Sequence, residues 1–131
     1  MRYLVATGDP SSSGVKTEIV DLSNPTISCL LEDIPYQYGS AGGLLGTTPV
    51  ICGGYASDYL NDCILYGTSQ SISMNAKRWH ASSVALTNNK LWIMGGKKID
   101  VYHNSTEFLT IDGTVNGPTL PEAVYLSLIH I

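Results

Sequence analysis

Charged residues are scarce in this chain, and several features that would define a function class are missing. Only 14% of the 131 residues are charged, 44% are hydrophobic, and the formal net charge is −4. High apolar content with low charge excludes an intrinsically disordered chain and favours a buried sheet. Because an acidic chain without a basic stripe lacks the electrostatic footprint of a nucleic-acid binder, we expect no nucleic-acid partner.

Long hydrophobic runs and helical periodicity are also absent. No run approaches the roughly 20 apolar residues that a membrane-spanning helix needs, so the sequence predicts no membrane segment. The opening stretch, Met1–Val5, predicts a strand rather than a signal peptide. No stretch of useful length repeats its apolar residues at the helical period, which excludes a helical domain.

Metal-binding and catalytic patterns are missing as well. The three cysteines, Cys29, Cys52 and Cys63, contain no CxxC pair, which argues against a structural zinc site. The three histidines are not spaced as metal ligands, and no Ser/His/Asp or Cys/His order repeats. The sequence therefore predicts no catalytic residue, no metal site and no cofactor.

The chain does contain an internal repeat. Residues 78–96 comprise a polar stretch, an apolar strand, a two-Asn turn, a second apolar strand and the doublet Gly95-Gly96. The same pattern stands 42 positions earlier and ends on Gly53-Gly54, which aligns Ser82 with Ser40. Self-similarity at this period predicts one supersecondary unit stacked on copies of itself.

Alternating polar and apolar residues, with Gly, Pro and Asn between the runs, predict strands throughout. The first unit has strands at 3–7, 16–22 and 27–31, which form a meander, and the second has strands at 40–45, 49–54, 62–66 and 70–73. The third has two strands within 79–96, then a short Lys97-Lys98 loop and strands at 99–102 and 107–111. This alignment places Tyr66 and Tyr102 at matching points of the third strand.

A four-stranded antiparallel unit repeating every 40-odd residues is typical of a β-propeller blade. The Gly-Gly doublet after the second strand and the tyrosine on the third resemble the kelch repeat. We therefore predict an all-β fold, a partial kelch-type β-propeller made of four-stranded antiparallel blades. The chain departs from the pattern at Thr7, which replaces one glycine of the first doublet, and only the third unit carries Arg78 and His80.

The kelch resemblance extends over residues 1–125. It implies a partial first blade at 2–34, a second at 38–74, a third at 79–112 and the start of another at 120–125. Since a propeller typically closes with 4–8 blades, we interpret the chain as a fragment of a larger propeller protein. The last residues, 126–131, resemble a translated sequencing adaptor and are interpreted as a non-native scar, the alternative being the first strand of the next blade.

Most distinctive residues are assigned to blade structure rather than to a ligand. Glycines end the second strand where φ is positive or a side chain would collide, and aromatic residues fill the wedge between blades. The structural motif consists of Gly8, Gly53, Gly54, Tyr66, Arg78, His80, Trp92, Gly95, Gly96 and Tyr102.

The loops on one face of such blades are the predicted binding surface. The candidate contact residues are Tyr36, Tyr38, Asp58, Tyr59, Arg78, Lys97 and Lys98. Exposed aromatics and arginine are enriched in protein contacts, so the sequence predicts a non-catalytic protein-binding module. The alternatives are a propeller enzyme of the galactose-oxidase-like or carbohydrate-active type, and a fragment without a function of its own. The copper oxidases with this fold need a Cys–Tyr cross-link and two histidine ligands, which the sequence does not supply.

Two features concern the cellular compartment. Asn104-Ser105-Thr106 is an N-glycosylation sequon on a predicted turn, although hairpin turns use the same residues. Cys52 and Cys63 fall on adjacent predicted strands and form either a disulfide or two buried thiols. Together they favour an extracellular protein. The alternative is a cytoplasmic propeller of the kind that recruits substrates to ubiquitin ligases or binds actin.

Overall fold

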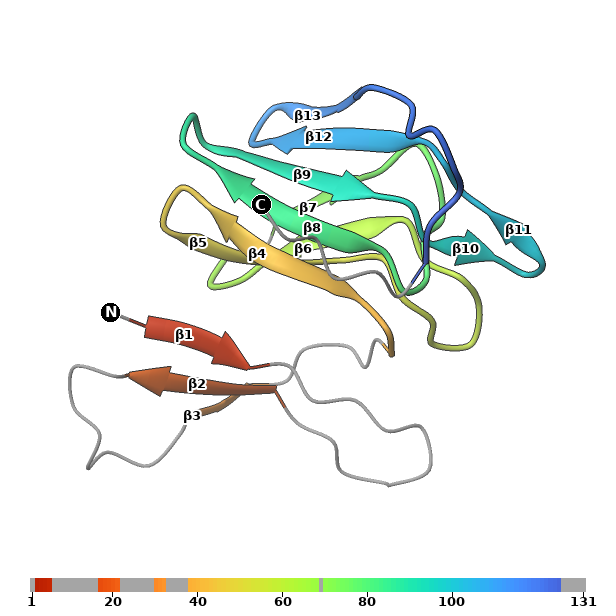
Figure 1. Ribbon diagram of the computed structural model, residues 1–131. Helices are drawn as coiled ribbons and strands as arrows, with labels where there is room; N and C mark the ends of the chain where they lie inside the picture. Colours follow the sequence, from red (N-terminus) through yellow and green to blue (C-terminus); the bar gives the residue numbers. More distant parts are fainter. Residues whose placement is uncertain (1, 6–16, 22–29, 33–37, 69, 126–131) are drawn as a thin grey trace. The chain divides into compact units, whose positions relative to one another are not determined.

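The computed structural model describes residues 2–5, 17–21, 30–32, 38–68 and 70–125 (Figure 1). The chain divides into two compact units, Met1–Tyr38 and Gly39–Ile131, and each is described by itself. The described residues form antiparallel strands and no helix, which confirms the predicted all-β fold. No helix among them is therefore long and apolar enough to cross a membrane.

The first unit contains a three-stranded antiparallel sheet. It consists of β1 (Arg2–Val5), β2 (Thr17–Asp21) and β3 (Leu30–Glu32), in the order β1-β2-β3. The central strand pairs with both neighbours, as the predicted meander requires. Gly8 and Tyr36, two of the predicted site residues, lie outside the described residues, as does the segment 126–131.

The second unit opens with a four-stranded sheet that contains the predicted strands of the second repeat. Its strands are β4 (Ala41–Leu45), β5 (Thr48–Cys52), β6 (Asp62–Leu65) and β7 (Ser71–Ser73). They follow one another in the sheet in chain order, β4-β5-β6-β7. Only two residues join β4 to β5, and the first, Gly46, has a φ of +65°, which a glycine adopts at little cost.

A second four-stranded sheet has the same topology. It contains β8 (Ser82–Leu86), β9 (Lys90–Met94), β12 (Thr106–Thr110) and β13 (Gly113–Asn116), in the order β8-β9-β12-β13. A separate hairpin of β10 (Lys97–Lys98) and β11 (Val101–Tyr102) is inserted between β9 and β12, beyond the end of β9 (Figure 1).

The hairpin corrects the strand assignment made from the sequence for the third repeat. The predicted third strand, at 99–102, lies outside the four-stranded sheet. The predicted fourth strand, at 107–111, corresponds to β12, which is the third strand of that sheet. Backbone pairing fixes this order, because the Gly95 N–H donates to the Ser105 carbonyl just as the Gly53 N–H donates to that of Asp62. Tyr102 is 50% exposed on the hairpin, so it does not fill a wedge between sheets.

The repeat is also less regular than a constant spacing of 42. The first strands begin 41 positions apart, at Ala41 and Ser82, because the second hairpin turn is one residue longer. The Gly-Gly doublets are 42 apart. In the sheet register Thr106 of β12 corresponds to Cys63 of β6, 43 positions earlier, because residues 97–104 form a longer loop than 55–61. Ser82 therefore corresponds to Ala41, not to Ser40.

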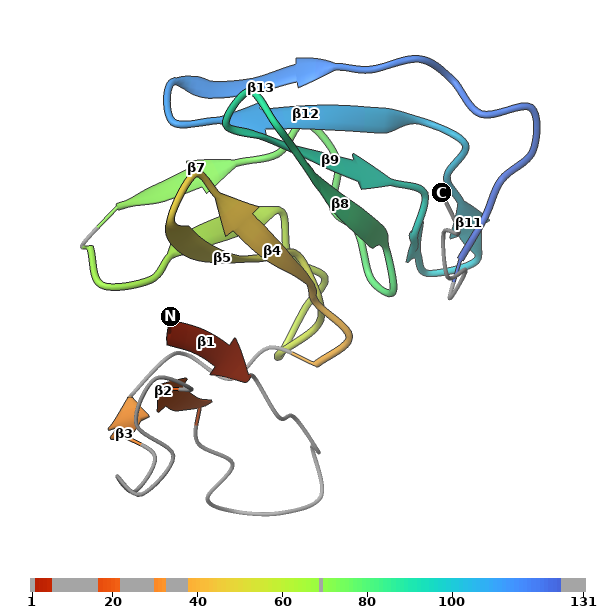
Figure 2. The same cartoon turned by 60° about the vertical axis from the view of Figure 1, so that its left-hand side comes forward.

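The two four-stranded sheets pack face to face, with β4 beside β8 and β9 (Figure 2). The core between them contains Val50, Leu65, Leu91 and Leu109, none more than 1% exposed. Gly43 makes the close approach feasible, because a Cβ there would stand 2.5 Å from Cδ1 of Leu91. One face of each sheet is thus buried by the apolar pattern that the sequence predicts.

A disulfide joins β5 to β6. Cys52 and Cys63 are directly opposite in the sheet register, and their Sγ atoms are bonded at 2.07 Å. Both are almost completely buried, at 1% and 0% exposure. The bond therefore links adjacent strands inside the core, which is the arrangement that the sequence left open against two free thiols.

Removing this disulfide should destabilise the second unit. The bridge closes a loop across a sequence separation of 11 residues, and a loop of this size is worth about 3 kcal/mol through the entropy of the unfolded chain. Urea unfolding of Cys52→Ser/Cys63→Ser should show a matching drop in the free energy of unfolding. Cys29→Ser keeps the pair and is the control. A double variant as stable as the parent in the absence of reductant would contradict the bond.

Candidate functional site

A buried ion pair holds the segment that connects the two four-stranded sheets. Arg78, just before β8, and Glu107, on β12, are each 1% exposed, and Arg78 Nε donates to Glu107 Oε2 at 2.8 Å. The guanidinium also donates to the carbonyls of Gly95 and Ser105 and to the hydroxyl of Ser105. Arg78 was a candidate contact residue, but its burial makes it a structural residue.

The carboxylate of Glu107 binds the connecting segment a second time. Its two oxygens accept backbone N–H groups of Asn75, at 2.5 Å, and Ala76, at 3.3 Å. Residues 75–78 are thereby fastened to β12 by three donors to one buried carboxylate. A buried charge needs partners of this kind because desolvation is costly. The sequence showed the arginine, but nothing in the local pattern of Thr106–Thr110 identified its partner.

The ion pair fixes the start of a cluster of rings at one end of the sheets. Trp79 and His80 follow Arg78 directly, and their rings are 4.3 Å apart. Tyr125 lies 6.0 Å from His80 and 5.4 Å from Tyr102. Because Tyr102 and Tyr125 are 50% and 37% exposed, these rings form an accessible aromatic surface.

Lys97 stands at the centre of these rings. Its Nζ is 4.8 Å from the ring centroid of Trp79, 4.9 Å from that of Tyr125 and 5.6 Å from that of Tyr102. The backbones of Trp79 and Lys97 exchange two hydrogen bonds of 2.9 Å, which hold the lysine in place. We call Trp79, His80, Lys97, Tyr102 and Tyr125 the aromatic–lysine platform.

A second pair of rings extends the platform. Tyr55 and Tyr59, in the loop after β5, are 5.1 Å apart in an edge-to-face arrangement, and Tyr59 is 6.0 Å from Trp79. Asp58 between them pairs with Lys77 at 2.8 Å, and this hydrogen bond, with one from the Tyr59 N–H, lowers the pKa of the Asp58 carboxyl. The loop after β5 and the connecting segment before β8 therefore meet beside the platform.

The structure brings several predicted contact residues together at this end of the second unit. Asp58, Tyr59 and Lys97 belong to the platform or border it, and Lys98 is exposed on the adjoining hairpin. Tyr38 is half-buried and belongs to the first unit. Trp79 and Tyr125, which complete the platform, are not among the contact residues selected from the sequence. Both are aromatic and follow a Gly-Gly doublet at corresponding connections, and this was a usable signal.

Both described histidines have a lowered pKa. Burial lowers the pKa of His80 below its ordinary 6.5, and the nearby charge of Lys97 lowers it further. Burial also lowers the pKa of His103, with the Arg78 charge acting in the same sense. The Nε2 of His103 is 3.1 Å from the Lys77 carbonyl. Since a carbonyl can only accept, Nε2 carries the proton in the neutral ring.

Asn104, the sequon residue, is exposed between β11 and β12. Its carbonyl accepts the N–H of Leu120 at 2.7 Å, so the backbone is fixed while the side chain faces solvent. Of the other two sequon residues, Ser105 binds Arg78 and Thr106 is buried, with its hydroxyl donating to Pro118. Among the described residues, no three His, Cys, Asp or Glu side chains come together as a metal site.

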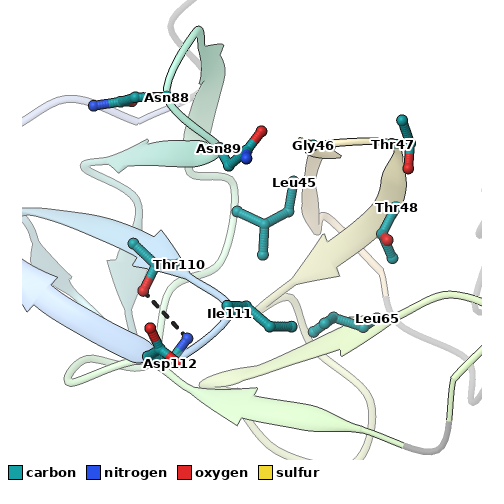
Figure 3. A pocket seen from close by; sticks show the side chains of 10 residues that line it. All are labelled: Leu45, Gly46, Thr47, Thr48, Leu65, Asn88, Asn89, Thr110, Ile111 and Asp112. Atoms are coloured by element: carbon teal, nitrogen blue, oxygen red, sulfur yellow. Dashed lines mark hydrogen bonds between the residues drawn. The ribbon is translucent and has the colours of Figure 1, made fainter.

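A separate hollow lies at the opposite end of the sheets, among the hairpin turns. Its volume is about 510 Å³, and Figure 3 shows the side chains of Leu45, Leu65 and Ile111 converging in it. The rest of the lining is mostly polar and includes Asn88, Asn89, Thr47, Thr48 and Thr110. The hollow has an apolar floor and a polar rim, and its lining includes no histidine or cation.

Comparisons with known proteins bear on the fold. No family model matches the chain, and no curated protein matches it in sequence. Among solved structures, that of YjhT is similar to this chain with a TM-score of 0.59 and 16% sequence identity. The match covers 79% of this chain and 36% of the other, so this chain spans about a third of the length of YjhT. At this identity the likeness concerns the fold alone.

Breaking the buried ion pair should be costly. Glu107→Gln keeps the size of the side chain but leaves the Arg78 charge buried without a counter-charge, which typically costs about 3–5 kcal/mol. Denaturant unfolding should show this loss. Asp58→Asn removes the carboxylate of an exposed ion pair and is the matched control, with an unfolding midpoint close to the parent's. Equal effects of the two substitutions would contradict the role of the pair.

Stability should fall in mild acid because of the two histidines. Both pKa values are lower in the folded than in the unfolded chain, so below about pH 6.5 the unfolded state binds more protons and is favoured. Stability is complete above that pH and declines as the pH falls towards the folded-state values. The melting temperature should drop between pH 7.5 and 5.5, and His80→Gln/His103→Gln should show a smaller drop. An unchanged drop in the variant would refute the assignment.

Proposed function

We propose that the chain is a non-catalytic protein-binding module and that its four-stranded sheets are blades of a kelch-type β-propeller. Two sheets with the same strand order, each with a Gly-Gly doublet at the end of its second strand, support the repeat. Their face-to-face packing is the arrangement of neighbouring blades. The aromatic–lysine platform carries the functional part of the proposal.

The composition of the platform suits a protein partner. Aromatic side chains that are partly exposed and already ordered supply contact area at a low cost in conformational entropy, and such residues dominate binding energy at protein interfaces. Tyr102 and Tyr125 have this character. Lys97 adds a positive charge that forms no ion pair with another described residue. An acidic side chain of the bound protein would pair with it.

Rigidity also supports binding at this end. The platform starts directly after the buried ion pair of Arg78 with Glu107, and hydrogen bonds fix the backbones of Trp79, His80 and Lys97. His80 even holds a φ of +55°, with its N–H donating to Gly39 at 2.8 Å. A surface that is ordered before binding loses little freedom when a partner docks.

The alternative is a propeller enzyme of the galactose-oxidase-like or carbohydrate-active type. The hollow at the opposite end favours it in one respect, because amides and hydroxyls around an apolar floor suit a hydroxylated small molecule. The platform is the stronger candidate because its rings contact one another in edge-to-face and tilted arrangements and its lysine is fixed among them. An oxidising, extracellular compartment is proposed in either case, since a buried disulfide persists there.

Substitutions in the platform should abolish partner binding without unfolding the chain. Proteins retained by the immobilised chain from an extracellular extract would be identified, and their affinities measured for Tyr102→Ala and Lys97→Ala. We expect each change to weaken binding at least about tenfold, as loss of an interface hot spot does. Ile111→Ala, which truncates a side chain 59% exposed at the opposite end, is the control. Binding that Ile111→Ala weakens and the platform variants do not would refute the proposal.

A further inference from the structure

One asparagine of this chain stands directly before a glycine. Of the seven asparagines, only Asn116, the last residue of β13, has glycine as its next neighbour, and it is exposed. Asparagine is a thermolabile residue, and glycine has no Cβ to obstruct the approach of its backbone nitrogen to the preceding side-chain amide. Asn116-Gly117 is therefore the dipeptide of this chain most prone to lose ammonia from its amide.

The packing around Gly117 explains why no larger residue stands there. A Cβ at this position would collide with Oγ1 of Thr106, and it would stand 3.1 Å from Cε2 of Phe108 and 3.3 Å from Nε1 of Trp92. These three side chains belong to β12 and β9. The close approach to the second sheet requires glycine after Asn116, so the fold itself imposes the reactive dipeptide.

The same glycine begins a segment that is fastened to β12 and to the residues before it. Its N–H donates to the Thr106 carbonyl at 2.9 Å, and the Thr106 hydroxyl donates to the Pro118 carbonyl at 2.7 Å. The Leu120 N–H donates to the Asn104 carbonyl at 2.7 Å. We call these three hydrogen bonds the 117–120 latch. Thr106 is 1% exposed, so its side of the latch is shielded from water.

The side-chain amide of Asn116 also has a partner. Its Oδ1 accepts a hydrogen bond of 3.0 Å from Nδ2 of Asn75. The backbone N–H of Asn75 donates to Glu107, which is the cross-strand partner of Asn116. The amide and the Gly117 N–H, the two groups that would react with each other, are thus each hydrogen-bonded elsewhere, beside the buried ion pair.

We propose that Asn116 is a site of spontaneous deamidation whose rate the 117–120 latch controls. The Gly117 nitrogen loses its proton and attacks Cγ of Asn116, a C–N bond forms, and the side-chain nitrogen leaves as ammonia. One water molecule then opens the cyclic imide at either carbonyl, which gives aspartate or isoaspartate. The reaction needs no oxidant, reductant or enzyme. Because the closed latch commits the Gly117 N–H to Thr106, the reaction requires local opening of the segment.

The products would not restore the closed latch. Isoaspartate carries the main chain through its β-carbon, which adds one methylene group before Gly117 and moves the glycine out of register with Thr106. Both products also place a new carboxylate opposite that of Glu107, whose charge already pairs with Arg78. Opening of the latch therefore becomes irreversible once the amide has reacted. This inference does not depend on the binding role of the aromatic–lysine platform.

The test measures deamidation by mass in the 131-residue chain. The native chain and the chain unfolded in guanidinium chloride would be kept in the same mildly alkaline buffer. Cleavage after glutamate releases residues 108–122, in which Asn116 is the only asparagine. The mass gain that marks replacement of the amide NH₂ by OH should appear at least about tenfold more slowly in the native chain, because the latch has to open first. Rearrangement at Asp112-Gly113, in the same peptide, leaves the mass unchanged and does not interfere.

A matched pair of variants separates the latch from general stability. Thr106→Val removes the hydroxyl that holds Pro118, so the native chain should deamidate at least about threefold faster, with no change in the unfolded chain. Thr110→Val makes the same change at the other end of β12 and should leave both rates unaltered. Equal rates in the native and unfolded parent would overturn the proposal, as would a native Thr106→Val chain that reacts no faster than the parent.

The irreversible step has its own measurement. Chains deamidated while unfolded would be refolded, and the isoaspartate form would be separated by chromatography. Its melting temperature should lie below that of Asn116→Asp, which carries the same charge on an ordinary backbone. Equal melting temperatures would show that the latch closes again over isoaspartate and would refute this step.

Discussion

Arg78 and Glu107 are both removed from water, and the arrangement of the second unit depends on their contact. The carboxylate holds the guanidinium and two backbone N–H groups of the connecting segment, while the guanidinium holds two carbonyls and a hydroxyl near the Gly-Gly doublet. Within the part of the chain that the structure describes, neither charge has a second ion-pair partner, so the connection has one well-defined route. That route determines where Trp79 and Lys97 meet, and hence where the platform lies.

The same connection has two uses. At its start it fastens one sheet to the next, and at its end it supplies rings to an exposed surface. The second Gly-Gly doublet makes the same backbone hydrogen bond to Val124, an apolar residue where the first doublet has the arginine. Tyr125 follows Val124 and joins the platform as Trp79 follows Arg78 and joins it. A repeated backbone hydrogen bond therefore organises both the packing at the Gly-Gly doublets and the aromatic–lysine platform.

Much of the fold could be predicted from the sequence. The strand–turn–strand pattern, the Gly-Gly doublets and the placement of Cys52 and Cys63 on adjacent strands depend on neighbours in the chain, on period-two alternation and on positions with positive φ. The third strand of the last repeat could not be predicted. Val101 and Tyr102 are residues that favour strands, as Phe108 is, and only hydrogen bonding to β9 selects Thr106–Thr110.

The sequence by itself determined the all-β class, the repeat and the strands of the first four-stranded sheet, because these follow from local alternation and turn residues. Only the tertiary structure decided that Arg78 is buried against Glu107, 29 positions away, and that Lys97 stands among three rings from different segments. These contacts join residues distant in the chain, and their energies depend on desolvation and on orientation. No local pattern carries that information, so the site emerged only when the sheets were packed.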